Sequence, residues 1–123
     1  MPHNDFGEFI RARRATLRLS LRSFAEKADL DAGNASRIER GRVAPPENPE
    51  ILDRIASALD LRRGSTQYQQ LMDLAAAAKG RIPQDLLSDE QVAVRLPILF
   101  RTLRSKPLSG DQLEKLIDSI RKA

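Results

Sequence analysis

The sequence predicts an all-α protein: a five-helix N-terminal unit followed by a C-terminal helical hairpin. Apolar residues recur at spacings of three and four along most of the 123 residues, as they do on one face of an α-helix. Polar capping residues precede these stretches, and glycine or proline separates them. Only 4% of the residues are aromatic, so we expect a core of leucine, isoleucine and alanine.

Residues 19–41 predict two short helices joined by a tight turn. The first is expected over residues 21–28 with Ser20 as its cap, and the second over residues 32–40 with Asp31 as its cap. Gly41 follows where a left-handed residue is favoured. Such a pair is typical of a helix-turn-helix, whose second helix can enter the DNA major groove.

This stretch resembles the helix-turn-helix of the Xre/Cro/C1 family, to which the lambdoid phage repressors belong. The match rests on L-S-x-x-x-F-A-E-K-A and S-R-I-E-R-G, with the small Ala25 where the two helices cross. It covers about residues 6–61 and implies a lambda-repressor-like domain of five helices. Leu21 stands where the family usually has glutamine, and Asp29 where it usually has a turn glycine.

Three more helices are expected around this motif. Asp5 and Glu8 predict a capping pair for a first helix that ends near residue 16. Asn48 and Pro49 open a fourth helix that ends near residue 60. Ser65 or the next residue caps a fifth helix that ends near residue 79.

Within this unit, the resemblance implies an ion pair. Arg14 matches the arginine near the end of the family's first helix, and Glu39 matches the glutamate with which it pairs. We expect the pair to be partly buried; the alternative is two solvated side chains.

Residues 80–87 are expected to be a linker between the helix-turn-helix domain, residues 1–79, and a helical hairpin, residues 88–123. Capping boxes at Ser88 and Ser109 predict the two hairpin helices, and Pro97 should kink or break the first. Each helix has an apolar stripe: Leu96, Leu99, Phe100 and Leu103, then Leu113, Leu116, Ile117 and Ile120. Because so small a hairpin rarely buries enough surface alone, we expect it to form a homodimer; the alternatives are a cap on its own chain and a site for another protein.

Positive charge is concentrated on the helix-turn-helix. Of the chain's 21 basic and 17 acidic residues, residues 11–42 contain nine and four, which leaves 12 and 13 elsewhere. Together with the motif, this excess favours phosphate binding over a merely solvated surface.

The resemblance places base contacts at the start of the second helix and at Arg37. Arg37 can make a two-point contact to guanine and Asn34 to adenine, while Gly33 allows close approach and Ala32 can touch a thymine methyl. Alternatively, Asn34 and Arg37 contact phosphates. The expected phosphate-binding residues are Ser20, Arg11, Arg18, Arg22, Arg40 and Arg42.

No enzyme activity, cofactor or metal site is expected. The chain has no cysteine and a single histidine, His3, and it lacks the common nucleophile, phosphate-loop and zinc-peptidase motifs. No apolar run approaches 18 residues and no signal-peptide pattern opens the sequence, so a cytoplasmic location without a membrane partner is expected.

The predicted function is that of a sequence-specific DNA-binding transcriptional regulator, a dimeric repressor on a palindromic operator. One alternative is an antitoxin that binds a toxin and represses its own operon. Another is an interaction module that has lost DNA binding. The C-terminal half resembles small regulators encoded beside a zinc metallopeptidase that relieves repression, which implies a further protein partner.

Overall fold

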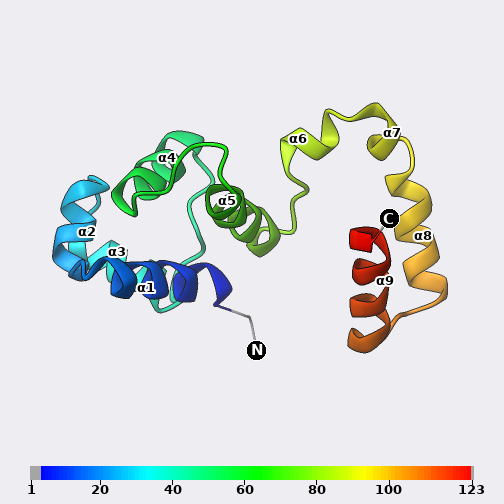
Figure 1. Ribbon diagram of the computed structural model, residues 1–123, viewed down its shortest axis with the longest axis horizontal. Coiled ribbons are helices and arrows are strands. Elements are labelled where there is room, and N and C mark those ends of the chain that lie inside the picture. The colour runs from blue at the N-terminus through cyan, green and yellow to red at the C-terminus, as the bar shows by residue number, and fades with distance from the viewer. Residues whose placement is uncertain (1–3, 123) are drawn as a thin grey trace. The chain divides into compact units, whose positions relative to one another are not determined.

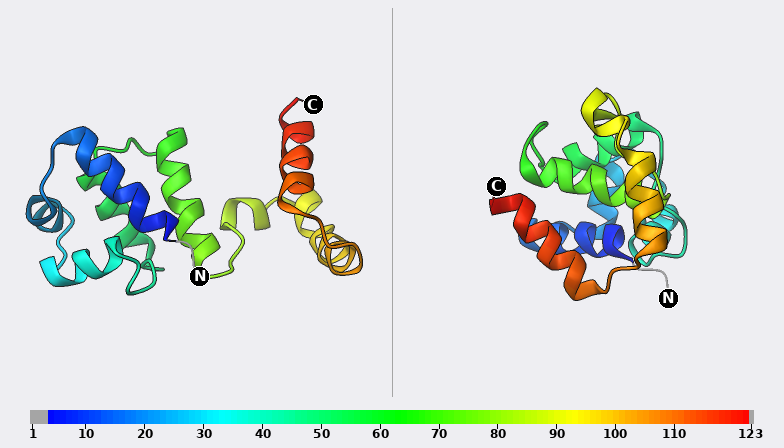
Figure 2. Two further views of the ribbon diagram at one scale, coloured as in Figure 1. Left: turned by 90° about the horizontal axis from the view of Figure 1, so that it is seen from below. Right: turned by 90° about the vertical axis from the view of Figure 1, so that its right-hand side faces the viewer.

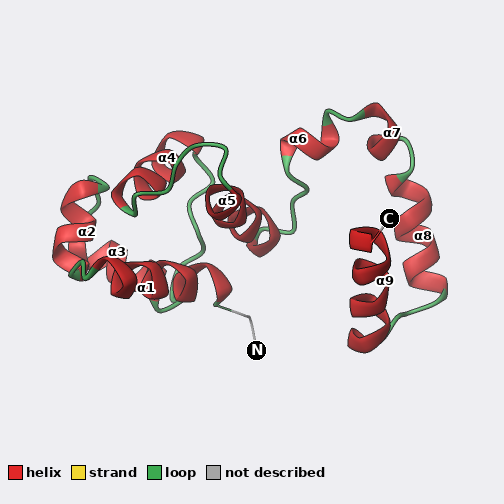
Figure 3. Cartoon of the chain, viewed as in Figure 1, coloured by secondary structure: helices red, strands yellow, loops and turns green. Residues whose placement is uncertain are grey.

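The structure, a computed structural model, describes residues 4–122, and the part it describes contains helices, turns and loops but no strand (Figure 3). The all-α prediction is confirmed. The chain forms two compact units, Met1–Pro83 and Gln84–Ala123. A short helix, α6 (Gln84–Leu87), opens the second unit within the segment that was expected to be a linker.

Five helices make up the described part of the first unit (Figure 1): α1 Asp5–Leu17, α2 Leu21–Lys27, α3 Ala32–Glu39, α4 Pro49–Ala58 and α5 Thr66–Ala78. Their ends fall within two residues of the predicted ones. Helix α2 packs on α3 and α4, α1 contacts α3 and α5, and α4 contacts α5; α1 and α5 are seen side by side in Figure 2. The largest fully buried side chains of the shared core are Ile10, Phe24, Ile55, Leu59 and Leu71.

Four of these helices begin with the expected side-chain cap. Each cap accepts a hydrogen bond from a backbone N–H two or three residues further on; the caps are Ser20, Asp31, Asn48 and Ser65. The capping pair predicted from Asp5 and Glu8 in α1 is wrong, because Asn4 occupies the N-cap position. Asn4 makes no side-chain cap bond; its amide instead donates to the carbonyl oxygen of Glu39 at 2.9 Å.

The same five helices also end alike. In each helix, the residue that follows the last turn is left-handed, with φ between +54° and +74°. The backbone N–H of this residue and that of the next residue donate hydrogen bonds to carbonyl oxygens of the last turn. These residues are Arg18, Asp29, Gly41, Asp60 and Gly80. Gly41 confirms the expected helix end. Asp29 and Asp60 adopt a conformation that costs a residue with a Cβ about 1 kcal/mol, so contacts elsewhere must hold them there.

An arginine binds the carbonyls exposed at the end of α4. Arg13 of α1 donates from Nε to the carbonyl oxygen of Leu59 at 2.9 Å and from Nη2 to that of Asp60 at 3.2 Å. The guanidinium has several donors in one plane, and its charge lies at the negative end of the helix dipole. This pair of hydrogen bonds from one guanidinium, an arginine fork, therefore joins α1 to the end of α4 at one of the two left-handed aspartates.

The second unit has no buried residue between positions 84 and 122. After α6 come α7 (Glu90–Ala93), α8 (Leu96–Ser105) and α9 (Gly110–Lys122), and α8 and α9 diverge from the loop that joins them (Figure 2). Pro97 lies in the first turn of α8, which confirms the expected break. The side chains of the two apolar stripes, on α8 and α9, are exposed or half-buried in the single chain.

One predicted cap in this unit is wrong and the other is confirmed. The Asp89 carboxylate caps α7 by accepting from the N–H groups of residues 91 and 92, whereas the Ser88 hydroxyl donates to the Gln84 carbonyl. A carboxylate is the stronger acceptor of the two neighbours. At α9, Ser109 and Gln112 form the predicted reciprocal capping box, with bonds of 2.9 and 3.2 Å.

Gly7 allows the backbones of α1 and α3 to approach closely. A Cβ placed on Gly7 would overlap the carbonyl oxygen of Glu39, the last residue of α3. This role is not predictable from the sequence, because a single glycine within a helix carries no local signal of a distant contact.

We predict that Gly7→Ala destabilises the first unit, although alanine ordinarily favours a helix by about 1 kcal/mol over glycine. Overpacking against a backbone carbonyl should cost roughly 1–3 kcal/mol. Urea unfolding followed by circular dichroism measures the difference. The control is Gly33→Ala, where a Cβ would approach only the side chains of Asp31 and Arg37, and it should change stability far less. A Gly7→Ala protein as stable as the wild type would contradict the close approach.

Candidate nucleic-acid interface

Helix α3 has an inner and an outer face. Ala35, Ile38 and Glu39 are buried against the core, while Gly33 and Arg37 are exposed on the opposite face. Where α3 crosses α2, the small Ala25 is only 2% exposed, which lets the two helices pack closely. The outer face of α3 therefore carries exposed residues near both ends of the helix, at Gly33 and Arg37.

The inner face is fixed by Glu39, whose side chain is 6% exposed. Arg14 donates from Nη2 to Oε1 at 2.6 Å and from Nε to Oε2 at 2.9 Å, a two-point contact between α1 and α3. The remaining nitrogen of Arg14 donates to the Leu19 carbonyl at 2.9 Å. The hydrogen bond to Glu39 raises the pKa of Arg14, and burial opposes this rise. The ion pair implied by the family resemblance is thus present.

Arg11 shares the same carboxylate. Its Nε lies 3.3 Å from Glu39 Oε1, yet its side chain is 58% exposed. Two guanidinium groups facing one carboxylate leave a net positive charge at this edge of the unit. Arg11, which was expected to bind phosphate, is therefore held by a protein partner and still faces solvent.

The other arginines of the expected interface have no such partner. Within residues 4–122, their side chains are exposed and form no hydrogen bond or ion pair: Arg18, Arg22, Arg37, Arg40 and Arg42. The Ser20 hydroxyl, also predicted to bind phosphate, accepts the backbone N–H of Ser23 at 3.0 Å as a helix cap. The five arginines are therefore free to meet an anionic surface.

The first two residues of α3 have almost no side chain. Ala32 and Gly33 are exposed, and Asn34 is half-buried with its backbone N–H bound to the Asp31 carboxylate at 3.0 Å. A Cβ on Gly33 would lie 3.6 Å from Nη1 of Arg37, so this guanidinium extends back over the glycine. The donors of Arg37 are consequently presented at the most open part of the outer face.

A second arginine fork fixes the turn between α2 and α3. Arg54 of α4 donates from Nε to the Ala28 carbonyl at 2.9 Å and from Nη2 to the Asp29 carbonyl at 3.5 Å. Asp29 is the left-handed residue of this turn, with φ of +55°. The role of Arg54 was not predicted from the sequence, since Arg54 lies more than 20 residues from the carbonyls that it binds.

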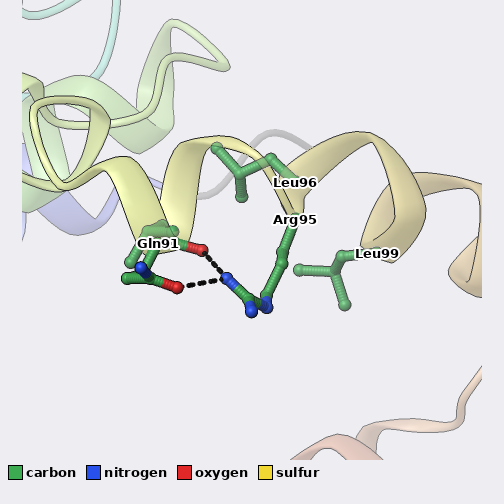
Figure 4. A pocket seen from close by; sticks show the side chains of 5 residues that line it. Gln91, Arg95, Leu96 and Leu99 are labelled. Atoms are coloured by element: carbon green, nitrogen blue, oxygen red, sulfur yellow. Dashed lines mark hydrogen bonds between the residues drawn. The ribbon is translucent and has the colours of Figure 1, made fainter.

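The second unit carries an open groove of about 440 Å³, seen in Figure 4. It is lined by Gln91, Val92, Arg95, Leu96 and Leu99. Arg95 Nη1 donates to the carbonyl and the side-chain oxygen of Gln91, at 2.9 and 2.7 Å, so its charge lies at the edge of an apolar surface. The other residues of the two predicted stripes are exposed or half-buried.

Two further properties concern residues 4–122 alone. No group of three or more His, Cys, Asp or Glu side chains in this range is placed to hold a metal ion. None of its helices is long and apolar enough to cross a membrane. His3 lies outside the described residues.

The motif, the caps and the exposed arginines together define a helix-turn-helix unit. The helix-turn-helix domain family matches residues 5–67, half of the 123-residue chain, and the chain belongs to this family. It therefore carries a helix-turn-helix domain of the DNA-binding class. No curated protein and no solved structure matches the chain.

We predict that Glu39→Gln lowers the free energy of unfolding by roughly 3 kcal/mol, because Arg14 then lies partly buried without a carboxylate. The matched control is Glu47→Gln. Glu47 pairs with Arg81 at 2.9 Å, but the two side chains are 46% and 69% exposed, so the loss should stay below about 1 kcal/mol. Urea unfolding of both variants measures the difference. Equal losses would show that the Glu39 pair acts as an ordinary surface pair.

Proposed function

We propose that the chain is a sequence-specific transcriptional regulator of the Xre/Cro/C1 type, a repressor that binds a palindromic operator as a dimer. One observation carries this proposal. The outer face of α3 presents Arg37 without a protein partner, while Glu39 holds the inner face against α1. A helix fixed on one side and open on the other suits insertion into the major groove.

In this proposal Arg37 reads a guanine through a two-point contact, because the guanidinium fork matches guanine O6 and N7. Asn34 reads an adjacent adenine, and Ala32 and Gly33 allow the backbone of α3 to approach the bases. Binding to the phosphates is assigned to residues around the helix: Ser20, Arg11, Arg18, Arg22, Arg40 and Arg42. These contacts would position α3 without distinguishing one sequence from another.

The alternative function is an interaction module that no longer binds DNA. The residues that support it are Leu21, Ala32 and Gly33, which offer few groups for contact with DNA. Leu21 is half-buried and packs against the core, so its place in the chain serves packing. The exposed arginines without protein partners favour DNA binding over this view, since positive charge clustered around a helix-turn-helix matches the charge of a phosphate backbone.

We assign dimerisation to the second unit. Its apolar stripes are uncovered; among them Leu99, Phe100, Leu116 and Ile117 are 41–44% exposed. Burying one such side chain contributes on the order of 1.5–3 kcal/mol. Two copies that share these faces would form the apolar core that one copy lacks.

The charges of α8 and α9 support a second copy as the partner. Arg101 and Arg104 on α8, and Glu114 and Asp118 on α9, form no ion pair in the part of the chain that is described. A surface that carries an apolar stripe and unpaired charges of both signs can pair with a second copy of itself across a two-fold axis. An antitoxin, the alternative function, would use the same stripes to bind a toxin.

The experiment that tests the function is selection of bound duplexes from a random DNA pool by the full-length chain. A two-fold symmetric sequence with half-sites about one helical turn apart is expected. Recovery of random sequences only, with no salt-dependent binding to any duplex, would contradict the proposal and favour the interaction module.

We predict that Arg37→Ala relaxes specificity at one base position and costs about 1–3 kcal/mol on the selected duplex, with less loss on others. Arg42→Ala should weaken binding to all duplexes similarly, because Arg42 lies beyond the end of α3. Titration of both variants against a panel of single-base variants of the duplex measures the pattern. A uniform loss for Arg37→Ala would assign Arg37 to a phosphate instead.

We predict that Ile117→Asp converts the full-length dimer into a monomer and weakens operator binding by roughly 100-fold, because each dimer loses two apolar contacts. Sedimentation equilibrium at micromolar concentration measures the association. Ser119→Asp adds the same charge to α9 outside the apolar stripe and should leave the dimer intact. If the wild-type chain is itself a monomer under these conditions, the second unit does not dimerise, and binding of a different protein becomes the favoured role.

A further inference from the structure

The turn between α2 and α3 is held from outside the helix-turn-helix. Asp29 adopts a left-handed φ of +55°, which glycine accepts without cost and a residue with a Cβ does not. The carbonyls of Ala28 and Asp29 would end α2 unpaired, but the Arg54 fork from α4 binds both. The fork thus supports a strained turn at the point that sets the direction of α3.

The direction of α3 matters because its other end is already fixed. Arg14 holds Glu39 at the C-terminal end of α3, and only residues 30 and 31 separate Asp29 from the first turn of the helix. With a rise of about 1.5 Å per residue, a tilt of about 10° about the Glu39 end would move residues 32–34 by roughly 1–2 Å. Base contacts require donor–acceptor distances within a few tenths of an ångström, so such a shift would break them.

We infer that Arg54 is a positioning residue for DNA recognition: it fixes the angle of α3 through the carbonyls of Ala28 and Asp29 and does not itself touch DNA. This inference rests on the proposed function. It assigns to α4, outside the helix-turn-helix, a share in setting the affinity and specificity of the proposed base contacts at the start of α3.

The chain contains a matched control for this role. Arg13 binds the last carbonyl of α4 and that of the left-handed Asp60 with the same two nitrogens, Nε and Nη2. Its fork secures an equivalent helix end that does not lead into α3. Arg13→Ala and Arg54→Ala therefore remove the same kind of contact, and only the second removes it from the turn before the recognition helix.

The test compares both variants of the full-length chain on the duplex that the wild-type chain selects from a random pool. Both should lower the melting temperature by similar amounts. Arg54→Ala should weaken binding at least 10-fold, measured well below the melting temperature, whereas Arg13→Ala should stay within about 2-fold of the wild type. Arg54→Lys, which retains the charge and one donor group, should recover part of the loss and serves as the second variant if alanine unfolds the unit.

Two further readouts separate positioning from other roles. The Leu30 amide, bonded to the Ala25 carbonyl at 2.8 Å, reports on the turn and should exchange faster with solvent in Arg54→Ala than in Arg13→Ala. The dependence of binding on salt should keep the wild-type slope in Arg54→Ala, since no phosphate contact is lost.

Each contrary outcome overturns the inference in a different way. Equal loss of binding in the two variants would show a general effect of stability. A salt slope reduced by about one in Arg54→Ala would show direct contact with a phosphate. If the wild-type chain selects no duplex at all, the proposed function fails and the inference fails with it, a result visible before any variant is made.

Discussion

The carboxylate of Glu39 is the contact on which the placement of α3 depends. Arg14 binds it at two points from α1, and the carbonyl of the same residue accepts the Asn4 amide. Gly7 removes the side chain that would separate the two backbones there. A charge, a hydrogen bond and a close packing contact thus meet at one residue, so the inner face of α3 cannot shift without breaking all three. The outer face of α3 takes no part in these contacts.

The arginines of the first unit fall into two groups, those that bind groups of the protein and those that have no partner. The number of arginines in the sequence does not show this difference. Arg13 and Arg54 bind helix-end carbonyls, and Arg14 binds a carboxylate, so their charge is used inside the protein. Arg37 and Arg42 have no partner in the described part of the chain. The excess of basic residues in the sequence therefore overstates the charge that an anion would meet. The remaining excess lies on and around α3, where it can act together with the helix.

Local features were predictable from the sequence and distant contacts were not. Ser20, Asp31 and Gly41 fix the ends of α2 and α3 through neighbours in the chain, so their roles follow from spacing alone. Gly7 and Arg54 act on residues more than 20 positions away, and nothing beside them in the sequence marks this. At α7, two adjacent residues could cap the helix, and the stronger acceptor prevailed. The DNA contacts remain predictions, because they depend on a partner that the chain does not contain.

The absence of buried residues between positions 84 and 122 has a consequence for how such a regulator would respond to its own abundance. Short helices without a core are marginal in water, so in the proposed dimer their order comes from association. Dilution would then loosen α8 and α9 as it separates the two copies, and would expose them to proteolysis. Newly made chains would persist only once enough of them had accumulated. Occupancy of the operator and the lifetime of the protein would thus share one concentration threshold.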